Sequence, residues 1–185
     1  MEICVGPECR PDLIGSEPLC DESLWRIEKN FVLLTFMGPI TEPAAGEIMI
    51  QEITDAGGTG ADLSADFTFS VEGAGNVLRI TENVDSPLNP LTHRHWYRFT
   101  NLGAWAGGGL FERDYVVQMG DCTNDGLVVG ADFSCVNAKI SCFNCPDDRA
   151  DINGDNLILG ADASLVNSFI SSFPVAKPSG HDCSP

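Results

Sequence analysis

Basic residues are scarce in this sequence. Its 185 residues include 10 Lys and Arg against 27 Asp and Glu, which gives a formal net charge of −17. Proteins bind nucleic acid by neutralising phosphates with Lys and Arg, and they bind anionic membrane surfaces in the same way. The composition therefore predicts no nucleic-acid partner and no attraction to an acidic membrane, whereas it suits cation binding.

Long apolar runs are also lacking. A membrane helix needs about 20 apolar residues, but the most apolar stretch, residues 31–40, is shorter and contains Gly38-Pro39. The first twenty residues show neither the basic start nor the apolar run of a secretory signal. With 43% hydrophobic residues, the chain still has material for a core. We expect a folded protein that does not insert into a membrane.

Sequence motifs for catalysis are missing as well. There is no Gly-x-Ser-x-Gly elbow, no glycine-rich phosphate loop and no His-Glu-x-x-His zinc motif. There is no Asn-x-Ser/Thr site either, so N-linked sugars are not expected. We predict that the protein is not an enzyme.

Cysteine, in contrast, is abundant. Eight cysteines indicate an oxidising compartment, so we expect an extracellular or cell-surface protein with disulfide bonds. Three cysteines lie in residues 1–20 and five in residues 122–183. If all pair within the chain, at least one bridge joins these two regions; the alternative is a bridge between chains. The disulfide candidates are Cys4, Cys9, Cys20, Cys122, Cys135, Cys142, Cys145 and Cys183.

One cysteine pair allows other chemistry. Cys142 and Cys145 have the spacing of a redox pair or of half a zinc site, for which His181 and Cys183 could supply the remaining ligands. In a cysteine-rich chain, structural disulfides are the favoured interpretation.

Three regions differ in composition. Residues 1–24 form a cysteine-bearing lead segment, residues 25–119 alternate short β-forming segments with turn residues, and residues 120–185 follow another pattern. The expected strands are Phe31–Phe36, Glu47–Ile53, Asp66–Glu72, Asn76–Thr81, His95–Thr100 and Arg113–Met119. A series of short strands like this is typical of an all-β sandwich of the immunoglobulin or fibronectin III kind.

The third region contains an internal repeat. Residues 121–141 align with residues 151–171 at a constant offset of 30, without a gap, and 11 of the 21 positions are identical. A repeat this close indicates two copies of one structural unit.

Each copy contains a twelve-residue loop with side-chain oxygens at positions 1, 3, 5 and 12. Hard cations such as Ca²⁺ bind six to eight oxygens, and this spacing places the ligands around one centre. Position 7 contributes a backbone carbonyl, and position 6, Gly126 or Asn156, must adopt a left-handed backbone. The predicted ligands are Asp121, Thr123, Asp125, Leu127 and Asp132 in loop 1, and Asp151, Asn153, Asp155, Leu157 and Asp162 in loop 2.

The loops therefore predict two calcium ions with a structural role. Chelation is expected to unfold residues 120–173, because the carboxylates of each loop would repel one another without the ion. Thr123 at position 3 is neutral and branched, so we expect loop 1 to bind more weakly than loop 2. The aliphatic side chains at position 8, Val128 and Ile158, are expected to pair the two loops back to back.

The flanks of the loops distinguish between families of calcium-binding proteins. A short helix is expected after position 12 of each loop, whereas a strand (115–119) or a turn (145–150) precedes it. This loop–helix unit is half of an EF-hand, and two such units over residues 120–173 resemble the type I dockerin family, as found after β-rich modules in planctomycete-like bacterial proteins. The resemblance implies a small α-helical calcium-binding domain. The apolar residues at helical spacing are Phe133, Val136 and Ile140 in one copy and Val166, Phe169, Ile170 and Phe173 in the other.

The resemblance also bears on the partner. Dockerins of cellulose-degrading assemblies bind cohesins through loop positions 10 and 11, commonly Ser-Thr, but here these positions are Gly130-Ala131 and Gly160-Ala161. We therefore expect an extracellular assembly protein that associates with itself in a filament or surface layer. In the alternative, the tail docks the sandwich, as a carbohydrate-binding cargo, onto a cohesin-like receptor.

Two further groups of side chains have alternative interpretations. His93 and His95 would share one face of a strand, either as half a metal site or as part of a solvated surface. Trp96, Tyr97 and Trp105 could form a sugar-stacking platform, although sandwich domains commonly bury such residues.

Overall fold

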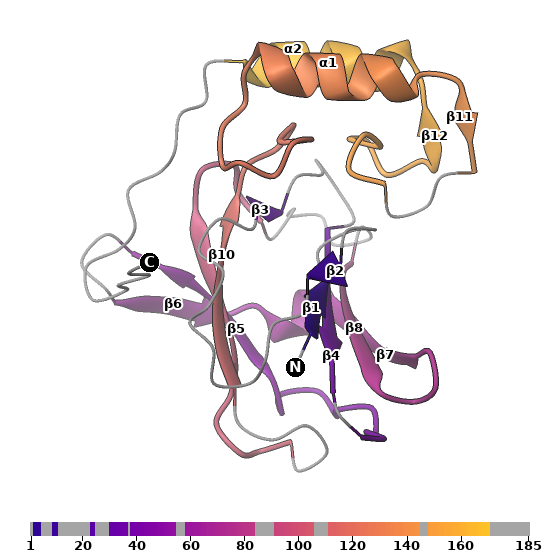
Figure 1. The fold of residues 1–185 in the computed structure, drawn as a ribbon. Coiled ribbons are helices and arrows are strands. Elements are labelled where there is room, and N and C mark those ends of the chain that lie inside the picture. Colours follow the sequence, from indigo (N-terminus) through magenta and orange to yellow (C-terminus); the bar gives the residue numbers. More distant parts are fainter. Residues whose placement is uncertain are drawn as a thin grey trace.

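The computed structural model describes residues 2–4, 9–10, 23–24, 30–36, 38–54, 58–83, 91–105, 111–144 and 148–170 (Figure 1). Most of the regular structure within these ranges is β-strand, in two five-stranded sheets and one two-stranded sheet, with two short helices. None of the helices described is long and apolar enough to cross a membrane.

The first sheet has the strand order β2-β1-β4-β8-β7 and is antiparallel throughout. Its centre is β4 paired with β8, in which Val32 lies opposite Ile80 and Leu34 opposite Leu78. Every second residue of β8 is buried, as expected of a strand with one face on a core. The strands are β1 (Glu2–Cys4), β2 (Cys9–Arg10), β4 (Phe31–Thr35), β7 (Phe67–Glu72) and β8 (Val77–Glu82).

The second sheet has the order β3-β10-β9-β5-β6. All its pairs are antiparallel except β3, which runs parallel to β10. A register shift interrupts the pairing of β5 with β6, between Gln51 and Ile53, and the short helix η1 (Ser64–Asp66) follows. The strands are β3 (Ser23–Leu24), β5 (Met49–Ile53), β6 (Thr59–Asp62), β9 (Trp96–Asn101) and β10 (Phe111–Val117).

The two large sheets face each other across a shared core. Phe67 of β7 meets Phe99 of β9 edge to face at 5.9 Å between ring centroids, and Phe99 meets Tyr115 of β10 at 5.3 Å. Both sheets contribute fully buried aliphatic side chains to one cluster, including Leu34, Ile50 and Ile80. Face-to-face packing of this kind is a β-sandwich arrangement.

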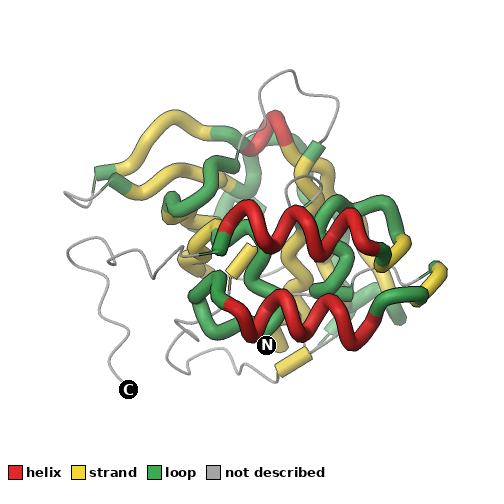
Figure 2. The backbone as a smooth tube through the Cα atoms, turned by 90° about the horizontal axis from the view of Figure 1, so that it is seen from above, coloured by secondary structure: helices red, strands yellow, loops and turns green. Residues whose placement is uncertain are grey.

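The helices α1 (Gly130–Lys139) and α2 (Gly160–Phe169) lie side by side across one end of the sheets (Figures 1 and 2). After α1, the strand β11 (Cys142–Phe143) pairs antiparallel with β12 (Leu157–Ile158), which precedes α2. The end of α1 and the start of α2 therefore lie at the same side, and the two helices run in opposite directions.

The buried core continues from the sheets into the repeat region. One cluster contains Val117 and Met119, at the end of β10, together with Val128, Val136 of α1 and Val166 of α2. Gly120 lies at this junction with a φ of +94°, and a Cβ there would approach Val128 Cγ1 to 3.3 Å and the Val166 Cα to 3.5 Å. The described residues of the predicted regions 25–119 and 120–185 thus share one core.

Each of the six expected strand segments overlaps a strand, which confirms the β-rich fold. The helices differ from expectation, because each begins at loop position 10 and includes position 12. At position 8, Ile158 pairs with Cys142 of β11, Val128 of loop 1 is an isolated bridge residue, and both side chains are fully buried in the shared core. Val136 and Val166 form the buried side of the helices, whereas Phe133, Ile140 and Ile170 are exposed, and Phe173 lies outside the described residues.

Candidate metal centre

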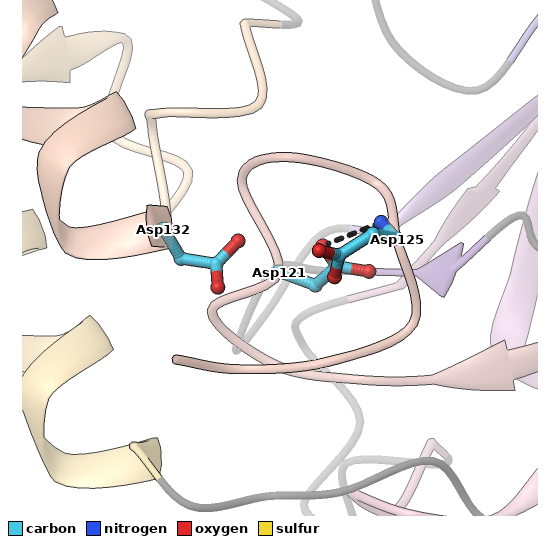
Figure 3. Close-up of side chains that lie close together, drawn as sticks. All are labelled: Asp121, Asp125 and Asp132. Carbon is cyan, nitrogen blue, oxygen red and sulfur yellow. Dashed lines mark hydrogen bonds between the residues drawn. The ribbon is translucent and has the colours of Figure 1, made fainter. Parts of the chain in front are cut away.

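Loop 1 connects β10 to α1 and gathers three carboxylates. Asp121 and Asp132 are fully buried, whereas Asp125 is exposed. Each of the three offers an oxygen, and these oxygens all lie within 4.8 Å of one another. Figure 3 shows Asp132 reaching from the first turn of α1 toward Asp121 and Asp125. The loop thus places charges of one sign around a common centre.

The carboxylates also fold the loop, because they accept hydrogen bonds from its backbone. Asp121 accepts from the N–H groups of Asp125 (3.2 Å) and Gly126 (3.0 Å). Asp132 accepts from the N–H groups of Thr123 (3.0 Å) and Val129 (2.8 Å). The bond to Val129 caps the N-terminus of α1, where an acidic side chain is favoured by the helix dipole.

Loop 2 repeats these contacts. Asp151 accepts from the N–H groups of Asp155 (3.1 Å) and Asn156 (3.2 Å), and Asp162 accepts from Asn153 (3.3 Å) and Leu159 (2.9 Å). Asp151 and Asp162 are fully buried, as are their counterparts in loop 1. Four hydrogen bonds therefore recur at the offset of 30 residues, and the sequence repeat is a structural repeat.

Each loop has a left-handed backbone at positions 4 and 6, and the two loops place Gly and Asn at these positions in opposite order. Position 6 is left-handed in both, at Gly126 (φ +75°) and Asn156 (φ +66°), as the sequence predicts. Position 4 is left-handed too, at Asn124 (φ +59°) and Gly154 (φ +76°), although no such turn was predicted there. Gly and Asn are the residues that adopt this conformation most readily, and their exchange between positions 4 and 6 was the available signal.

The donor set of loop 1 fits a hard cation. Oxygens bound to one Ca²⁺ lie at about 2.3–2.6 Å from it, so any two of them are at most about 5 Å apart. The three carboxylates of loop 1 meet that limit. Thr123 Oγ1 lies 2.9 Å from Asp132 Oδ1, so the expected position-3 ligand adjoins the same centre. Leu127, the expected backbone-carbonyl ligand, is half-buried, and its N–H donates to Asp125 Oδ1 over 2.9 Å.

Loop 2 is less compact at its centre. Within the described ranges, Asp151, Asp155 and Asp162 do not form a second group of the kind found in loop 1. Both oxygens of Asp155 accept hydrogen bonds, from the Asn153 amide (2.9 Å) and from the N–H of Leu157 (2.8 Å). The better-gathered carboxylates are thus in loop 1, for which Thr123 had suggested the weaker site.

Gln118 fastens loop 1 to the sheet. This fully buried residue follows the last residue of β10, and its N–H donates to the Leu24 carbonyl over 2.9 Å. Its side-chain Nε2 donates to the carbonyl of Gly126 over 2.8 Å. The loop backbone is therefore held by the sandwich as well as by its own carboxylates.

His93 and His95 have separate partners in the described structure. Both precede β9, and in the part of the chain that the structure describes neither belongs to a group of three potential ligands. His95 Nδ1 lies 2.7 Å from Glu52 Oε1. His93 Nδ1 accepts from the N–H of Met119 over 3.0 Å, and its ring is 4.9 Å from that of Phe169. Burial, then the charges of Arg94 and His95, lower the pKa of His93.

The predicted sugar-stacking platform is wrong, because all three aromatic side chains are buried. The exposed fractions of Trp96, Tyr97 and Trp105 are 6%, 1% and 2%. Trp105 Nε1 donates to the Thr41 carbonyl over 2.9 Å, and its ring packs edge to face on Phe36. These side chains belong to the core and offer no surface for stacking a sugar.

One complete disulfide is described, between Cys122 at loop position 2 and Cys135 in α1, with Cα atoms 6.1 Å apart. Cys142 is disulfide-bonded as well, so it is not a thiolate ligand for zinc. Cys4 and Cys9 lie opposite each other on β1 and β2. The side chains of these two residues, and Cys20, Cys145, His181 and Cys183, lie outside the described residues.

No protein-family model, no curated protein and no solved structure matches this chain. The resemblance to dockerins therefore rests on the residues of the loops and helices themselves.

Proposed function

We propose that this is a calcium-binding protein of the extracellular space, with one Ca²⁺ in each loop. Asp121, Thr123, Asp125, Leu127 and Asp132 would hold one ion, and Asp151, Asn153, Asp155, Leu157 and Asp162 the other. The observation that carries the proposal is the recurrence of buried position-1 and position-12 carboxylates, with the same backbone hydrogen bonds, in both loops. In this proposal the tail is dockerin-like and follows an immunoglobulin- or fibronectin-like sandwich.

The role proposed for the ions is structural. Removing a carboxylate from water is costly unless a cation or hydrogen bonds compensate, and the first and last carboxylates of each loop are fully buried. Two ions would change the net charge from −17 to −13, so most of the acidity lies outside the loops. That remaining charge keeps the protein soluble until it meets its partner.

For the biological role we propose assembly without catalysis, through self-association in a filament or surface layer. Exposed apolar side chains support an interaction surface on the helix layer: Phe133, Ile140 and Ile170 are 36–39% exposed, and Phe143 of β11 is 68% exposed. Burying such side chains against a partner removes apolar surface from water, which favours association.

Docking onto a cohesin-like receptor is the second candidate. Positions 10 and 11 of both loops are exposed, and a Cβ added at Gly130 or Gly160 would meet no atom within 4 Å. This smooth surface has the location that dockerins use, although it lacks their hydroxyls.

Chelation tests the calcium proposal. Thermal melts followed by circular dichroism, with excess Ca²⁺ and with EDTA, should show a lower melting temperature without the ion, because a ligand at 1,000 times its Kd stabilises by about 4 kcal/mol. An unchanged melt would contradict the structural role. Light scattering at raised protein concentration then separates the partners: polymers that dissolve in EDTA support self-association, and a monomer in Ca²⁺ supports a receptor.

A further inference from the structure

Arg149 reaches from the second repeat into the first. It lies two residues before Asp151, which opens loop 2, but its Nη2 donates to the backbone carbonyl of Asp121 over 2.7 Å. The same nitrogen is 3.8 Å from Asp121 Oδ2, and the two side chains are 4% and 0% exposed. A hydrogen bond from a charged donor is stronger than a neutral one, and burial protects this one from competing water.

The turn that carries Arg149 is anchored to α1 and to loop 2. Lys139, the last residue of α1, donates to Asp148 Oδ1 over 2.8 Å. The same oxygen accepts from the N–H of Ala150 (2.9 Å), and the N–H of Asp151 donates to the Asp148 carbonyl (3.0 Å). Residues 148–151 thus connect the end of α1, the first ligand position of loop 2 and, through Arg149, the first ligand position of loop 1.

The first repeat has no equivalent of this contact. The residue 30 positions before Arg149 is Met119, which is buried and apolar and whose N–H donates to His93. Loop 1, the loop that Arg149 touches, is also the one in which three carboxylates are gathered. This asymmetry between otherwise matched loops points to a specific task for Arg149.

We propose that Arg149 is a positioning residue that couples the two calcium loops. An ion in loop 2 fixes Asp151 and the adjoining turn, the turn places Arg149 on Asp121, and Asp121 is thereby held ready for an ion in loop 1. Coupling of this kind is reciprocal, so an ion in loop 1 favours binding in loop 2 by the same factor. The proposal rests on the calcium binding proposed above.

A double-mutant cycle on the full chain tests the coupling. Calcium is titrated while the amide resonance of Gly126 reports occupancy of loop 1, first in the wild type and then in Asp162→Asn, which disables loop 2. We expect this substitution to weaken loop 1 about tenfold, within the usual range of coupling between sites. In the Arg149→Met background the same substitution should weaken loop 1 by less than twofold. Both proteins compared in that background lack the charge of Arg149, so its direct effect on calcium affinity cancels.

Arg98→Met is the matched control. Arg98 also pairs with carboxylates, at 2.8 Å from Asp114 and 3.0 Å from Glu112, but it lies in the sandwich. Its loss should leave the tenfold effect of Asp162→Asn unchanged. If Arg149→Met does not fold, Lys139→Met loosens the same turn through a half-exposed ion pair and should reduce the tenfold effect to about threefold.

Three results would each overturn the coupling. Asp162→Asn could weaken loop 1 equally with and without Arg149, it could do so equally with and without Lys139, or it could have no effect on loop 1 at all. A wild-type protein that binds no calcium is a different outcome, because it removes the proposed function itself.

Discussion

The disulfide between Cys122 and Cys135 replaces a pair of apolar residues found at the same positions of the other repeat. Cys122 is 4% exposed and ties loop position 2 to α1. Thirty residues further on, the corresponding residues are Ile152, fully buried, and Leu165, which packs against the same core. One repeat thus joins its loop to its helix by a covalent bond, whereas the other places two apolar side chains in the core at the same positions.

The apolar pair should therefore substitute for the disulfide. A bridge that closes a loop of about 15 residues contributes roughly 3 kcal/mol in the chain-entropy model. The double substitution Cys122→Ile/Cys135→Leu should lose less than this, because burying each aliphatic side chain returns about 1–2 kcal/mol. Urea unfolding in Ca²⁺ should rank it above Cys122→Ser/Cys135→Ser. Equal stability of the two variants would show that the repeats do not share this packing.

Gly120 should not tolerate a side chain. Its φ of +94° disfavours other residues, and a new Cβ would come within 3.3 Å of Val128 Cγ1, so that side chain would have to shift. Gly120→Ala should lower the free energy of unfolding by about 1–3 kcal/mol in urea titrations. Gly130→Ala is the control, because that residue begins α1 and its new Cβ meets nothing within 4 Å; it should be neutral or stabilising.

The left-handed position 6 gives a second matched comparison. A Cβ at Gly126 meets no atom within 4 Å, so only the φ of +75° opposes substitution. Gly126→Asn should cost little, since Asn156 adopts this conformation in loop 2, whereas Gly126→Val should cost about 1–2 kcal/mol. Calcium affinity and thermal stability should fall in the same order. Equal effects of Asn and Val would contradict the left-handed requirement.

Stability should depend on pH through His93. Its folded-state pKa is lowered from the ordinary value of about 6.5, so the unfolded chain binds more protons than the folded chain just below pH 6.5. The stabilisation is fully present above about pH 6.5 and is lost as pH falls from there through the folded-state pKa. Protonation also removes the acceptor for the Met119 N–H beside α2.

Urea unfolding at pH 7.5 and pH 5.5 checks this dependence against variants. His93→Gln cannot titrate, so its loss of stability on acidification should be smaller than that of the wild type. His95→Gln should lie between the wild type and His93→Gln, because the charge of His95 contributes least to the lowered pKa of His93. Identical pH dependence of wild type and His93→Gln would contradict the assignment.

The features that could be predicted from sequence are those that depend on local pattern. Strands β4, β5, β7, β8, β9 and β10 all fall within segments of β-forming residues between turn residues. The loops were recognisable because two copies align without a gap. β6 was missed, since Thr59–Asp62 contains Gly and is mostly exposed, so it carries no hydrophobic alternation.

The features that could not be predicted depend on distant parts of the chain. Trp105 lies next to a glycine-rich segment of the sequence, but its indole N–H donates to the Thr41 carbonyl and its ring packs on Phe36, both of which are far earlier in the sequence. Arg149 stands in a polar turn and gives no local sign that its partner is Asp121, 28 residues earlier. The continuity of the core across residues 117–128 likewise depends on how α1 and α2 sit on the sheets.

The stoichiometry of calcium binding tests the central claim most directly. Isothermal titration of the full chain should show two ions bound, and Asp132→Asn or Asp162→Asn should each leave one, because each removes a buried carboxylate from one loop. Asp114→Asn, in the sandwich, should leave both. Binding of two ions by the Asp132→Asn/Asp162→Asn double variant, or no binding by the wild type at millimolar Ca²⁺, would contradict the account.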